Sequence, residues 1–594
     1  MKHNIFRYIL LLGVILFATT GCKKLLEEQP RTGFTPSFFT TNDGIQGGIA
    51  GIYSSFRGQW ATQVWTQLFN EGIDESLTAA VSDVDHWATY NTPQIKANTS
   101  NYEGFWNTLF IDINTANGVL QYGVDADIPA ATKTQLLAQA KFLRGFCYFY
   151  LVTTFGAVPL HTTFNTSPST ADAPAPLADL YAQMIKDFTE AAAELPNTPT
   201  ASMGKPAFKA TALYLLAKTY LWRGWSSVAQ GNDFTSAYTT AKTLIDNKAT
   251  YGLNLLPYFG TVFREGQEYS SEVLMVIDHT KDLKFGQNSA VGAGAVNGQE
   301  NKSNFFWKPN YPTVTVNYPA ATGSALTLRD TRNGRPFQRI RPNTRYIIDV
   351  AFANRATDAR YEGTFQTVWL SNSVAESATG STGVTTPRGT LINGVDTAIW
   401  MQDRLVTPAE RAAFKGIIFE PDHLAGTTNP FTPSLYPSVR KFDDSTRGHM
   451  NDYSDRPYIL FRFSDVYLIA AEAAFKGGGT MQQAADMINV LRTRAALKAK
   501  QTPAEYTAAV AAQQITAGQV TLDFILDERS RELFAEDTRW WDLSRTKTLV
   551  ARVIQYNTQG AAGVKDFHML RPIPQSQIDL VTEGPKYPQN PGYN

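Results

Sequence analysis

The sequence contains few of the residues that build metal sites, disulfide frameworks or nucleic-acid surfaces. Two of its 594 residues are cysteines, Cys22 and Cys147, and its 7 histidines show no HExxH or HxxxH spacing. Lysine and arginine number 53, and so do aspartate and glutamate, which leaves a formal net charge of zero. A zinc site and a disulfide framework are therefore not expected. A general nucleic-acid binder is excluded because it needs a basic excess.

Motifs of nucleotide and serine-hydrolase sites are also absent. The chain has no G-x-x-x-x-G-K-[ST] loop, no G-x-S-x-G turn and no G-x-G-x-x-G. Each of these motifs places backbone or side-chain groups that its chemistry requires. We therefore expect no cofactor and no bound metal.

The first 21 residues have the composition of a secretory signal peptide. Lys2 and Arg7 precede an apolar run over 9–18 that is too short to span a membrane, and no later run is longer. Cys22 follows small residues, as in a bacterial lipobox, so we expect its thiol to be acylated and to anchor the chain to a membrane. Residues 22–39 would form a tether. The alternative is a plain signal peptide followed by a chance cysteine.

Amphipathic helices dominate the part that follows. Apolar residues at helical spacing predict helices at about 133–155, 177–195, 208–224 and 234–247. Small residues such as Ala217, Ala237 and Ala241 allow the last two to pack closely, as in a tetratricopeptide-like hairpin. Cys147 lies on the apolar stripe of the first helix and is expected to be buried.

A second pair of helices is predicted near the C-terminus, at about 466–474 and 484–491, on either side of three glycines. Residues 281–450 are instead rich in long Gly/Asn/Ser/Thr stretches, and such loops in a helical protein are usually functional or disordered. We therefore divide the chain into an N-terminal helical region (40–270), a loop-rich ligand-binding region (271–450) and a C-terminal helical region (451–594). The fold is expected to be mainly α. A generic helical bundle is the alternative to stacked hairpins.

Several segments together resemble the SusD/RagB family of nutrient-binding outer-membrane lipoproteins, over nearly the whole mature chain. They are AKFLRGF (140–146), FGAVPL (155–160), RFSDVYL (462–468), DER (527–529), PIP (572–574) and QNPGY (589–593). The resemblance implies a right-handed stack of four tetratricopeptide-like helix pairs, with long inserted loops and a few short strands. It also implies a surface-exposed lid on a SusC-like TonB-dependent transporter, to which the family delivers glycans or, in some members, peptides.

Acidic and basic residues alternate in the segment 528–545. They lie three apart and are expected to pair on one helix, as Glu528/Arg531, Glu536/Arg539 and Asp542/Arg545. Paired carboxylates could also indicate glycosidic acid–base chemistry. An adjacent guanidinium lowers a carboxyl pKa, however, which is the wrong direction for a general acid. We therefore expect structural ion pairs here, and also at Arg144 and Arg462, which lie beside apolar stripes.

A sugar-binding platform is predicted between residues 71 and 91. A pyranose ring stacks on aromatic faces while its hydroxyls bond to amides and carboxylates. Trp87 and Tyr90 lie in a polar stretch and are expected to be exposed, with Asp74, Asp85 and Asn91 as polar partners. The resemblance adds that aromatics of the corresponding loop contribute to the family's ligand platform.

Other tryptophans and tyrosines rank lower as ligand contacts. Trp307 and Tyr311, which follow the Asn/Gly-rich loop, are the second candidate pair. Weaker candidates are Trp369 and Trp400, and Trp65 and Trp106 are expected in the core because their settings are apolar helices.

Six arginines crowd the segment 329–345: Arg329, Arg332, Arg335, Arg339, Arg341 and Arg345. One interpretation is structural pairing with nearby acids such as Asp330, Asp349 and Asp358. The other is contact with an acidic polysaccharide. The sequence leaves both open.

The sequence thus predicts a lipid-anchored, non-enzymatic receptor that faces the exterior of the outer membrane. It would capture an oligosaccharide and pass it to a SusC-like transporter, and no nucleic-acid partner is expected. A peptide-binding member of the family, a surface glycoside hydrolase acting through Asp74 and Asp85, and a scaffold without a small ligand are the alternatives.

Overall fold

The computed structural model describes residues 35–81, 85–91, 93–95, 102–167, 169–200, 204–280, 301–372 and 379–593. Cys22, the predicted signal peptide and most of the predicted tether lie outside these ranges. Phe39, placed at the end of the tether, is fully buried and lies against Gly118. The folded body therefore begins before residue 40.

Helices are the main secondary structure of the molecule. Those of the N-terminal region are α2 (Asn42–Ser55), α3 (Gln63–Asn70), α4 (Asp85–Ala88), α5 (Glu103–Tyr122), α6 (Ala130–Phe155), α7 (Leu177–Glu194), α8 (Lys209–Trp225) and α9 (Asp233–Asp246). Those of the C-terminal region are α14 (Phe463–Ala473), α15 (Met481–Ala495), α16 (Pro503–Gln513), α17 (Leu522–Leu533), α18 (Arg539–Arg545), α19 (Leu549–Tyr556) and α20 (Gln575–Leu580). All six predicted helices are present, with ends shifted by a few residues.

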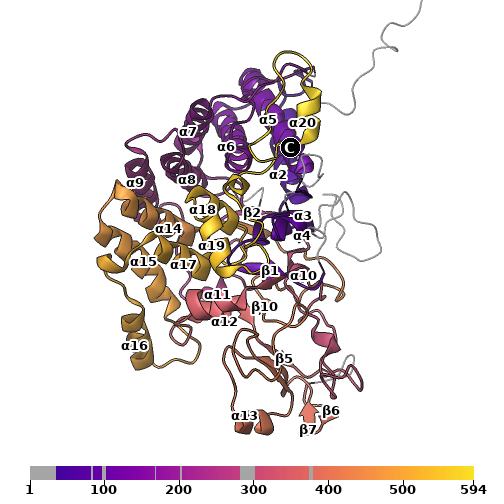
Figure 1. Ribbon diagram of the computed structural model, residues 1–594. Helices are drawn as coiled ribbons and strands as arrows, with labels where there is room; N and C mark the ends of the chain where they lie inside the picture. Colours follow the sequence, from indigo (N-terminus) through magenta and orange to yellow (C-terminus); the bar gives the residue numbers. More distant parts are fainter. Residues whose placement is uncertain are drawn as a thin grey trace, which may run out of the picture.

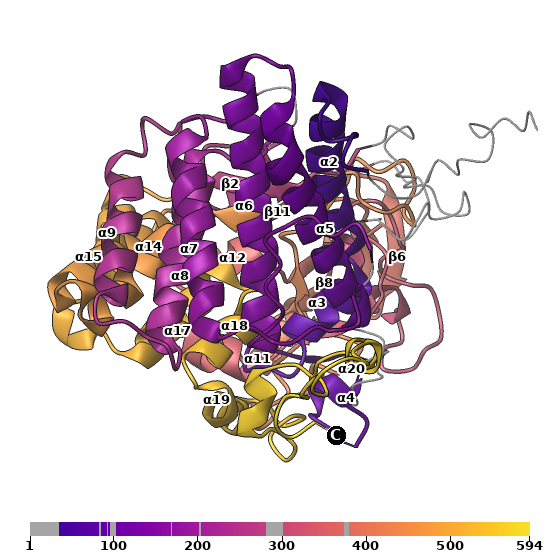
Figure 2. The same cartoon turned by 90° about the horizontal axis from the view of Figure 1, so that it is seen from above.

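The helices stack in series. From α5 to α9 each helix packs against the next, and α14 packs against both α9 and α15. Figure 2 shows α5, α6, α7, α8 and α9 side by side, with α14 and α15 continuing the row. The predicted stack of tetratricopeptide-like helix pairs is thereby confirmed.

Small residues set the distance between neighbouring helices. A Cβ atom added at Gly145 of α6 would lie 2.9 Å from the ring of Phe188 in α7. At Gly224 of α8 it would lie 2.8 Å from the ring of Phe234 in α9. Glycine at these positions lets an aromatic ring rest directly on the neighbouring backbone, as the sequence predicts for the hairpin.

The described part of the loop-rich region, residues 271–280, 301–372 and 379–450, carries short elements. Its helices are α10 (Ser303–Phe306), α11 (Thr344–Tyr346), α12 (Ala359–Thr364) and α13 (Pro408–Ala413), with helical turns η5 (Phe259–Thr261), η7 (Tyr311–Thr313) and η8 (Ile347–Ala351) nearby. The strands of the molecule are β1 (Ser76–Thr78), β2 (Val273–Ile277), β3 (Ile340–Pro342), β4 (Phe365–Gln366), β5 (Val368–Leu370), β6 (Thr382–Thr386), β7 (Gly389–Ile392), β8 (Thr397–Met401), β9 (Ile417–Phe419), β10 (Ser438–Val439) and β11 (Tyr458–Arg462).

These strands form small sheets that tie the loop-rich region to the helices. β1 pairs with β3, β4 with β10 and β2 with β11, all antiparallel. A three-stranded sheet of order β5-β8-β9, with β8 and β9 parallel, and the hairpin β6-β7 form the part farthest from the helical stack in Figure 1. Within the described ranges, no helix is long and apolar enough to cross a membrane.

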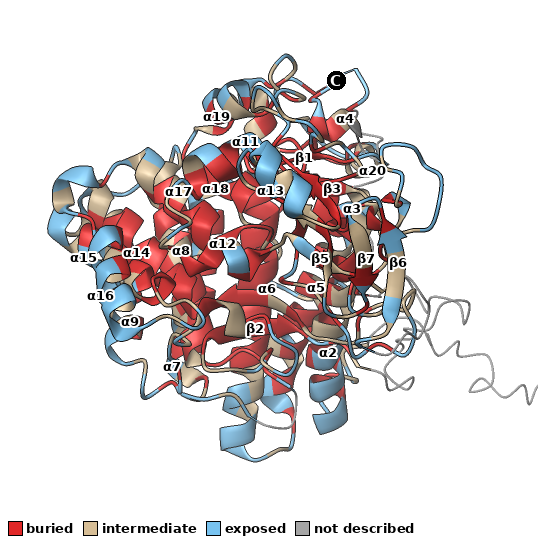
Figure 3. Cartoon of the chain, turned by 90° about the horizontal axis from the view of Figure 1, so that it is seen from below, coloured by how far each residue is buried: buried red, intermediate tan, exposed pale blue. Residues whose placement is uncertain are grey.

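One large apolar core runs through the helical stack, and smaller cores lie under the loop-rich region. The large core includes Cys147, Trp65 and Trp106, as predicted. A separate cluster around Tyr311, Trp369 and Phe419 supports the β5-β8-β9 sheet. In Figure 3, buried residues concentrate in the middle of the helical stack, while α13 and α16 are largely exposed.

The acidic and basic segment 528–545 forms two helices, contrary to the prediction of one. α17 ends at Leu533 and α18 begins at Arg539, and between them Ala535 and Asp537 adopt positive φ angles of 65° and 55°. Non-glycine residues rarely adopt this conformation and need support from their surroundings. Asp537 has that support: its carboxylate accepts hydrogen bonds from Asn70, from Trp65 Nε1 at 3.1 Å and from the Tyr458 hydroxyl at 2.6 Å.

Two of the three expected ion pairs in this segment form. Glu528 pairs with Arg531 at 2.8 Å, and Asp542 pairs with Arg545 at 3.0 Å. The pair Glu536/Arg539 does not form, because the break between the helices separates them. Glu536 instead accepts from Arg462 at 2.7 Å. The structural ion pairs predicted for other arginines are confirmed: Arg144 with Asp187, and Arg462 with Glu272, Glu532 and Glu536.

Candidate functional site

Trp87 and Tyr90, the predicted platform, are buried. Each side chain is 1% exposed, so the expectation that they face solvent is wrong. Trp87 meets the ring of Tyr102 edge-on at 4.6 Å, and the Tyr90 hydroxyl donates to the carbonyl of Gly72 at 2.6 Å. Neither ring presents a face on which a sugar could stack.

Trp87 helps to enclose a buried arginine from the far end of the chain. The guanidinium carbon of Arg571 lies 5.2 Å from the ring of Trp87, 5.7 Å from Tyr102 and 4.1 Å from Trp540. Its Nη2 donates to the carbonyl of Leu68 at 2.7 Å, and among the described residues no carboxylate pairs with it. Aromatic faces stabilise this cation where a carboxylate would otherwise be needed. The local sequence around Trp87 gives no sign of a partner so distant.

Asp74, the carboxylate predicted to bind sugar, is occupied by two arginines. Arg539 donates to both of its oxygens at 2.8 and 2.7 Å, and Arg552 donates at 2.6 Å. Burial raises the pKa of Asp74, but the charges of Arg539 and Arg552 outweigh it and lower that pKa to about 2. Asp74 is therefore an ionised structural group, neither a general acid nor a free hydrogen-bond acceptor.

The remaining polar candidates are less informative. Asp85 begins α4, and its side chain lies outside the described residues. Asn91 is exposed, and its amide donates to Gln94 at 2.9 Å.

Trp307 and Tyr311 are also core residues, with exposures of 1% and 0%. Trp307 packs against Phe534 at 5.7 Å, and the Tyr311 ring stacks on Trp369 at 6.1 Å. Trp369 is fully buried as well. Of the aromatics considered from the sequence, Trp400 alone is partly exposed, and it packs against Phe414 at 5.6 Å. The prediction failed because these rings pack against aromatic side chains from other parts of the chain, such as Tyr102 and Phe534.

A groove of about 450 Å³ opens where the helical stack meets the loop-rich region. Its lining includes Tyr258, Arg264, Glu265, Glu362, Gly363, Arg440 and Asp443. Pockets that take small molecules usually measure about 300 to 1,000 Å³. The groove is therefore large enough for one or two sugar rings, and it is the candidate functional site.

Two glycines bring the walls of the groove together. A Cβ atom on Gly363 of α12 would lie 2.6 Å from the ring of Phe259 and 3.4 Å from the Cα of Gly260, both in η5. The backbones of α12 and η5 can approach only because side chains are absent at this crossing. This contact places Tyr258 and Glu362 on the same groove, where the tyrosine hydroxyl donates to Glu362 at 3.2 Å.

The carboxylates of the groove already accept hydrogen bonds from the protein. Glu265 accepts from the backbone and hydroxyl of Ser445 at 2.5 and 3.1 Å. Asp443 pairs with Lys308 at 2.6 Å. Burial and then the charge of Glu362 raise the pKa of Tyr258, so its hydroxyl keeps its proton. These carboxylates therefore stabilise the wall of the groove.

The guanidinium N–H donors of the two groove arginines, in contrast, remain available to a ligand. Arg264 and Arg440 are exposed, and across the described ranges neither guanidinium pairs with a carboxylate. The guanidinium of Arg264 lies 5.9 Å from the ring of Tyr258. A guanidinium carries five N–H donors in a planar fork that suits vicinal hydroxyl or carboxylate oxygens. The groove thus combines an aromatic ring with open hydrogen-bond donors.

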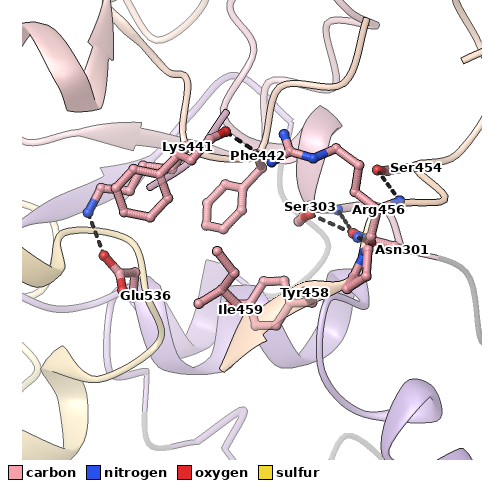
Figure 4. Close-up of a pocket in the computed structure, with 11 residues that line it drawn as sticks. Asn301, Ser303, Lys441, Phe442, Ser454, Arg456, Tyr458, Ile459 and Glu536 are labelled. Carbon is pink, nitrogen blue, oxygen red and sulfur yellow. Dashed lines mark hydrogen bonds and ion pairs between the residues drawn. The ribbon is translucent and has the colours of Figure 1, made fainter. Parts of the chain in front are cut away.

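Phe263 separates the groove from a much smaller pocket, shown in Figure 4. This pocket has a volume of about 20 Å³, and Lys441, Glu536, Arg456 and Tyr458 contribute to its lining. Lys441 pairs with Glu536 at 2.6 Å, and burial lowers the pKa of Lys441 to about 8 despite that partner. The space suits a single water molecule, so the pocket is no ligand site.

A buried network of ions fixes α12, and with it one wall of the groove, to the C-terminal helices. Arg360 of α12 is fully buried and contacts Asp358 at 2.7 Å, Glu528 at 2.8 Å and Glu532 at 3.2 Å. Glu532 also receives Arg462 at 3.1 Å. Glu528 and Glu532 come from α17, so the position of Glu362 in the groove depends on the helical scaffold.

Among the described residues, no group of histidine, cysteine, aspartate and glutamate side chains could hold a metal ion. Cys147 is a buried free thiol whose pKa burial raises well above its ordinary value. A thiol in this state is a poor nucleophile.

Two family models match the chain. The model described as the SusD family matches residues 417–593, and the model described as "Starch-binding associating with outer membrane" matches residues 26–221. The first match includes the C-terminal helical region and the end of the loop-rich region, and the second includes the N-terminal helical region as far as residue 221.

The curated relatives that match the chain are SusD-like proteins as well. SusD-like protein P25 of Formosa agariphila is 22% identical over 600 residues, which cover 97% of each chain. SusD-like protein P2 of the same organism is 29% identical over 299 residues, 48% of this chain and 55% of that protein. A SusD-like protein of Bacteroides ovatus is 23% identical over 279 residues, 44% of this chain and 47% of the relative. The chain thus matches about half the length of two of these relatives.

Solved structures share the fold. Surface glycan-binding protein A from Bacteroides thetaiotaomicron in complex with laminarihexaose has a TM-score of 0.63 at 18% identity, covering 93% of this chain and 100% of that one. A SusD homolog from the same organism has a TM-score of 0.65 at 20% identity, with 92% and 96% covered. At these identities the likeness establishes the fold alone.

Proposed function

The chain belongs to the SusD/RagB family, and on this premise we propose that it is a glycan-binding lipoprotein associated with the outer membrane. It captures an oligosaccharide at the cell surface and delivers it to a SusC-like TonB-dependent transporter, without cleaving it. Cys22 carries the lipid anchor. A neighbour of the same fold solved with laminarihexaose, and a second one described as laminarin-binding, support a carbohydrate ligand.

The groove beside Tyr258 is the observation that carries the proposal. Its volume of about 450 Å³ fits a short oligosaccharide, and its aromatic ring lies next to the donors of Arg264 and Arg440. The occupied carboxylates argue for binding over hydrolysis, because a glycosidase needs two carboxyl groups free to act on the substrate.

Titration calorimetry of the full-length protein in detergent, against a panel of oligosaccharides, tests the proposal. We expect binding without cleavage, weakened about tenfold or more, which corresponds to about 1.4 kcal/mol, by Tyr258→Ala and by Arg440→Ala. Tyr269→Ala is the matched control: it is an exposed tyrosine whose hydroxyl also donates to a carboxylate, that of Asp278 at 2.5 Å, but it lies outside the groove.

Each alternative has its own result in this experiment. Cleavage products would show a hydrolase. Binding of peptides in place of sugars would identify a peptide-binding member of the family, and silence across both panels would favour a scaffold. Loss of binding in Tyr269→Ala but not in Tyr258→Ala would place the ligand elsewhere.

The anchor is tested separately. Cys22→Ala should release the protein from the membrane fraction, because a thioether-linked lipid requires the thiol. Retention of the variant in that fraction would contradict the lipoprotein assignment.

A further inference from the structure

Phe263 lies in the wall between the groove beside Tyr258 and the small pocket of about 20 Å³. Among the described residues, it is the one side chain that lines both spaces. It is 8% exposed, so nearly all of its ring is inside the wall. The position of this ring therefore decides whether the two spaces are separate or joined.

The segment 440–443 follows the same boundary. Arg440 and Asp443 line the groove, whereas Lys441 and Phe442 line the small pocket. Side chains of one short segment thus contribute to both spaces. The groove and the small pocket are separated here by this segment and by the ring of Phe263.

The backbone of Phe263 is held in place from the side of the small pocket. Arg456 donates to the Phe263 carbonyl at 2.9 Å and also to the carbonyl of Asp443. The same guanidinium forms an ion pair with Glu268. Because one arginine bonds to both parts of the boundary, movement of the backbone is restricted. The side chain of Phe263 is therefore the part of the wall that sets the depth of the groove.

Two buried cations lie behind the ring. The Lys441 amine is 4.7 Å from the centre of the Phe263 ring, and the guanidinium carbon of Arg462 is 5.2 Å from it. Both cations pair with Glu536, at 2.6 and 2.7 Å. An aromatic ring face attracts a cation. These contacts favour the ring position that keeps the groove separate from the small pocket.

We propose that Phe263 is a specificity-determining residue of the groove. Its ring closes the groove toward Lys441 and excludes an oligosaccharide whose branch points at this wall, so that the unbranched chain binds better. A rigid wall rejects a ligand with an added group and keeps its contacts to the ligand that lacks the group. This inference rests on the proposed function, because it concerns which oligosaccharides the receptor takes.

Calorimetry of the full-length protein in detergent, with pairs of oligosaccharides that share a backbone, tests the inference. The pairs are cellotetraose with the xylose-branched heptasaccharide of xyloglucan, and mannopentaose with its galactose-branched form. The wild-type protein should bind the unbranched member of at least one pair about tenfold or more tighter. In Phe263→Ala this ratio of affinities should fall about tenfold, because the branch can enter the space in front of Lys441.

Phe442→Ala is the matched control, because it removes a phenylalanine that lines the small pocket but not the groove. Its ratio of affinities should equal that of the wild type. A general loss of structure weakens both members of a pair and leaves the ratio unchanged. Equal binding of both members of every pair by the wild type, an unchanged ratio in Phe263→Ala, or an equal fall in the control would overturn the inference.

Phe263→Leu provides the same test if the alanine variant does not fold. Leucine keeps apolar contacts but lacks the ring, so the ratio of affinities should fall in the same direction by a smaller factor. A folded Phe263→Leu variant with the ratio of the wild type would also overturn the inference. The melting temperature verifies that each variant is folded.

Reductive methylation tests the closed wall without a ligand. Burial lowers the pKa of Lys441 to about 8, so near that pH about half of its amines are neutral and can react once a reagent reaches them. Mass spectrometry should show Lys441 of the wild type reacting about tenfold or more slowly than the exposed Lys186, and Phe263→Ala should remove most of this protection. Equal reaction rates of the two lysines in the wild type would contradict a closed wall.

The inference and the proposed function fail in different ways. If an unbranched oligosaccharide binds and Tyr258→Ala weakens it, but Phe263→Ala leaves the ratio unchanged, the role of Phe263 is wrong and the receptor function stands. If no oligosaccharide binds to the wild type, the receptor function is wrong, and the specificity role of Phe263 fails with it.

Discussion

The helical scaffold and the surface of the loop-rich region both contain many arginines, but they use them in opposite ways. In the scaffold, Arg360, Arg462 and Arg539 are buried and each contacts one or more carboxylates. At the groove beside Tyr258, Arg264 and Arg440 are exposed, and among the described residues neither pairs with a carboxylate. A buried cation needs a compensating partner, which is a carboxylate for these three scaffold arginines and a set of aromatic faces for Arg571, whereas an exposed cation stays available to a ligand. Scaffold arginines should therefore govern stability, and surface arginines should govern binding.

Arg360→Ala is the variant that should cost the most stability. It leaves the buried carboxylates of Asp358 and Glu528 without their shared partner, and breaking such a buried pair costs about 3 to 5 kcal/mol. Urea denaturation should show a lower free energy of unfolding. The exposed Arg404, which pairs with Glu410 at 2.6 Å, is the control, and its replacement by alanine should leave the midpoint nearly unchanged. An equal loss of unfolding free energy in the two variants would contradict the distinction between buried and exposed arginines.

Trp87→Ala separates a structural role from a binding role. Removing the indole opens a cavity and takes one face from the aromatic enclosure of Arg571, so we expect a loss of about 3 to 5 kcal/mol. Affinity for oligosaccharide, measured by calorimetry at a temperature where the variant is folded, should change little. A large loss of affinity with wild-type stability would restore Trp87 as a ligand contact.

Acid should weaken the scaffold through Asp74. Its pKa is about 2 in the folded protein and 3.8 when unperturbed, so the folded state binds the proton less tightly than the unfolded state. Its contribution is present above pH 4 and is lost as the pH falls from about 4 to 2, by about 2 kcal/mol. The pH dependence of unfolding should be shallower in Asp74→Asn over this range. Parallel curves for the two proteins would contradict the pKa shift.

Two glycine replacements should give small effects of opposite sign. Gly145→Ala adds a methyl group 2.9 Å from Phe188 and should destabilise the stack by about 1 kcal/mol. Gly51 in α2 has no atom within 4 Å of an added Cβ, so Gly51→Ala should stabilise by about 0.5 to 1 kcal/mol. Thermal denaturation of both variants measures the difference, and shifts in the same direction would argue against close helix packing at Gly145.

The sequence predicted the scaffold well because its signals are local. Apolar periodicity located helices such as α6 and α14, and small residues such as Ala237 and Ala241 indicated close packing. Ion pairing was predictable where both partners lie on one helix, as for Glu528 and Arg531. The prediction failed for Glu536 because two residues with positive φ angles interrupt the helix before Arg539. Its partner is Arg462, which is 74 residues away in the sequence.

The binding surface was less predictable because it depends on contacts between distant segments. Tyr258, Glu362 and Arg440 come from three parts of the chain, and no motif joins them. Trp87 appears exposed from its polar neighbours, yet it is buried by Arg571, a residue far along the chain. The arginine-rich segment was recognised, but its interpretation required knowing where each nearby carboxylate is bound.

The enclosure of Arg571 also bears on the order of folding. Arg539 reaches Asp74 across 465 residues, Asn557 reaches the carbonyl of Ile73 across 484, and Arg571 reaches that of Leu68 across 503. The residues around Leu68 and Asp74 therefore cannot complete their contacts until the end of the chain has been synthesised. The helical stack can form one hairpin at a time from local contacts. Its N-terminal edge, in contrast, lacks its partners until the C-terminal segment is present. We therefore expect the early segment around Leu68 and Asp74 to be the last part of the stack to reach its native contacts.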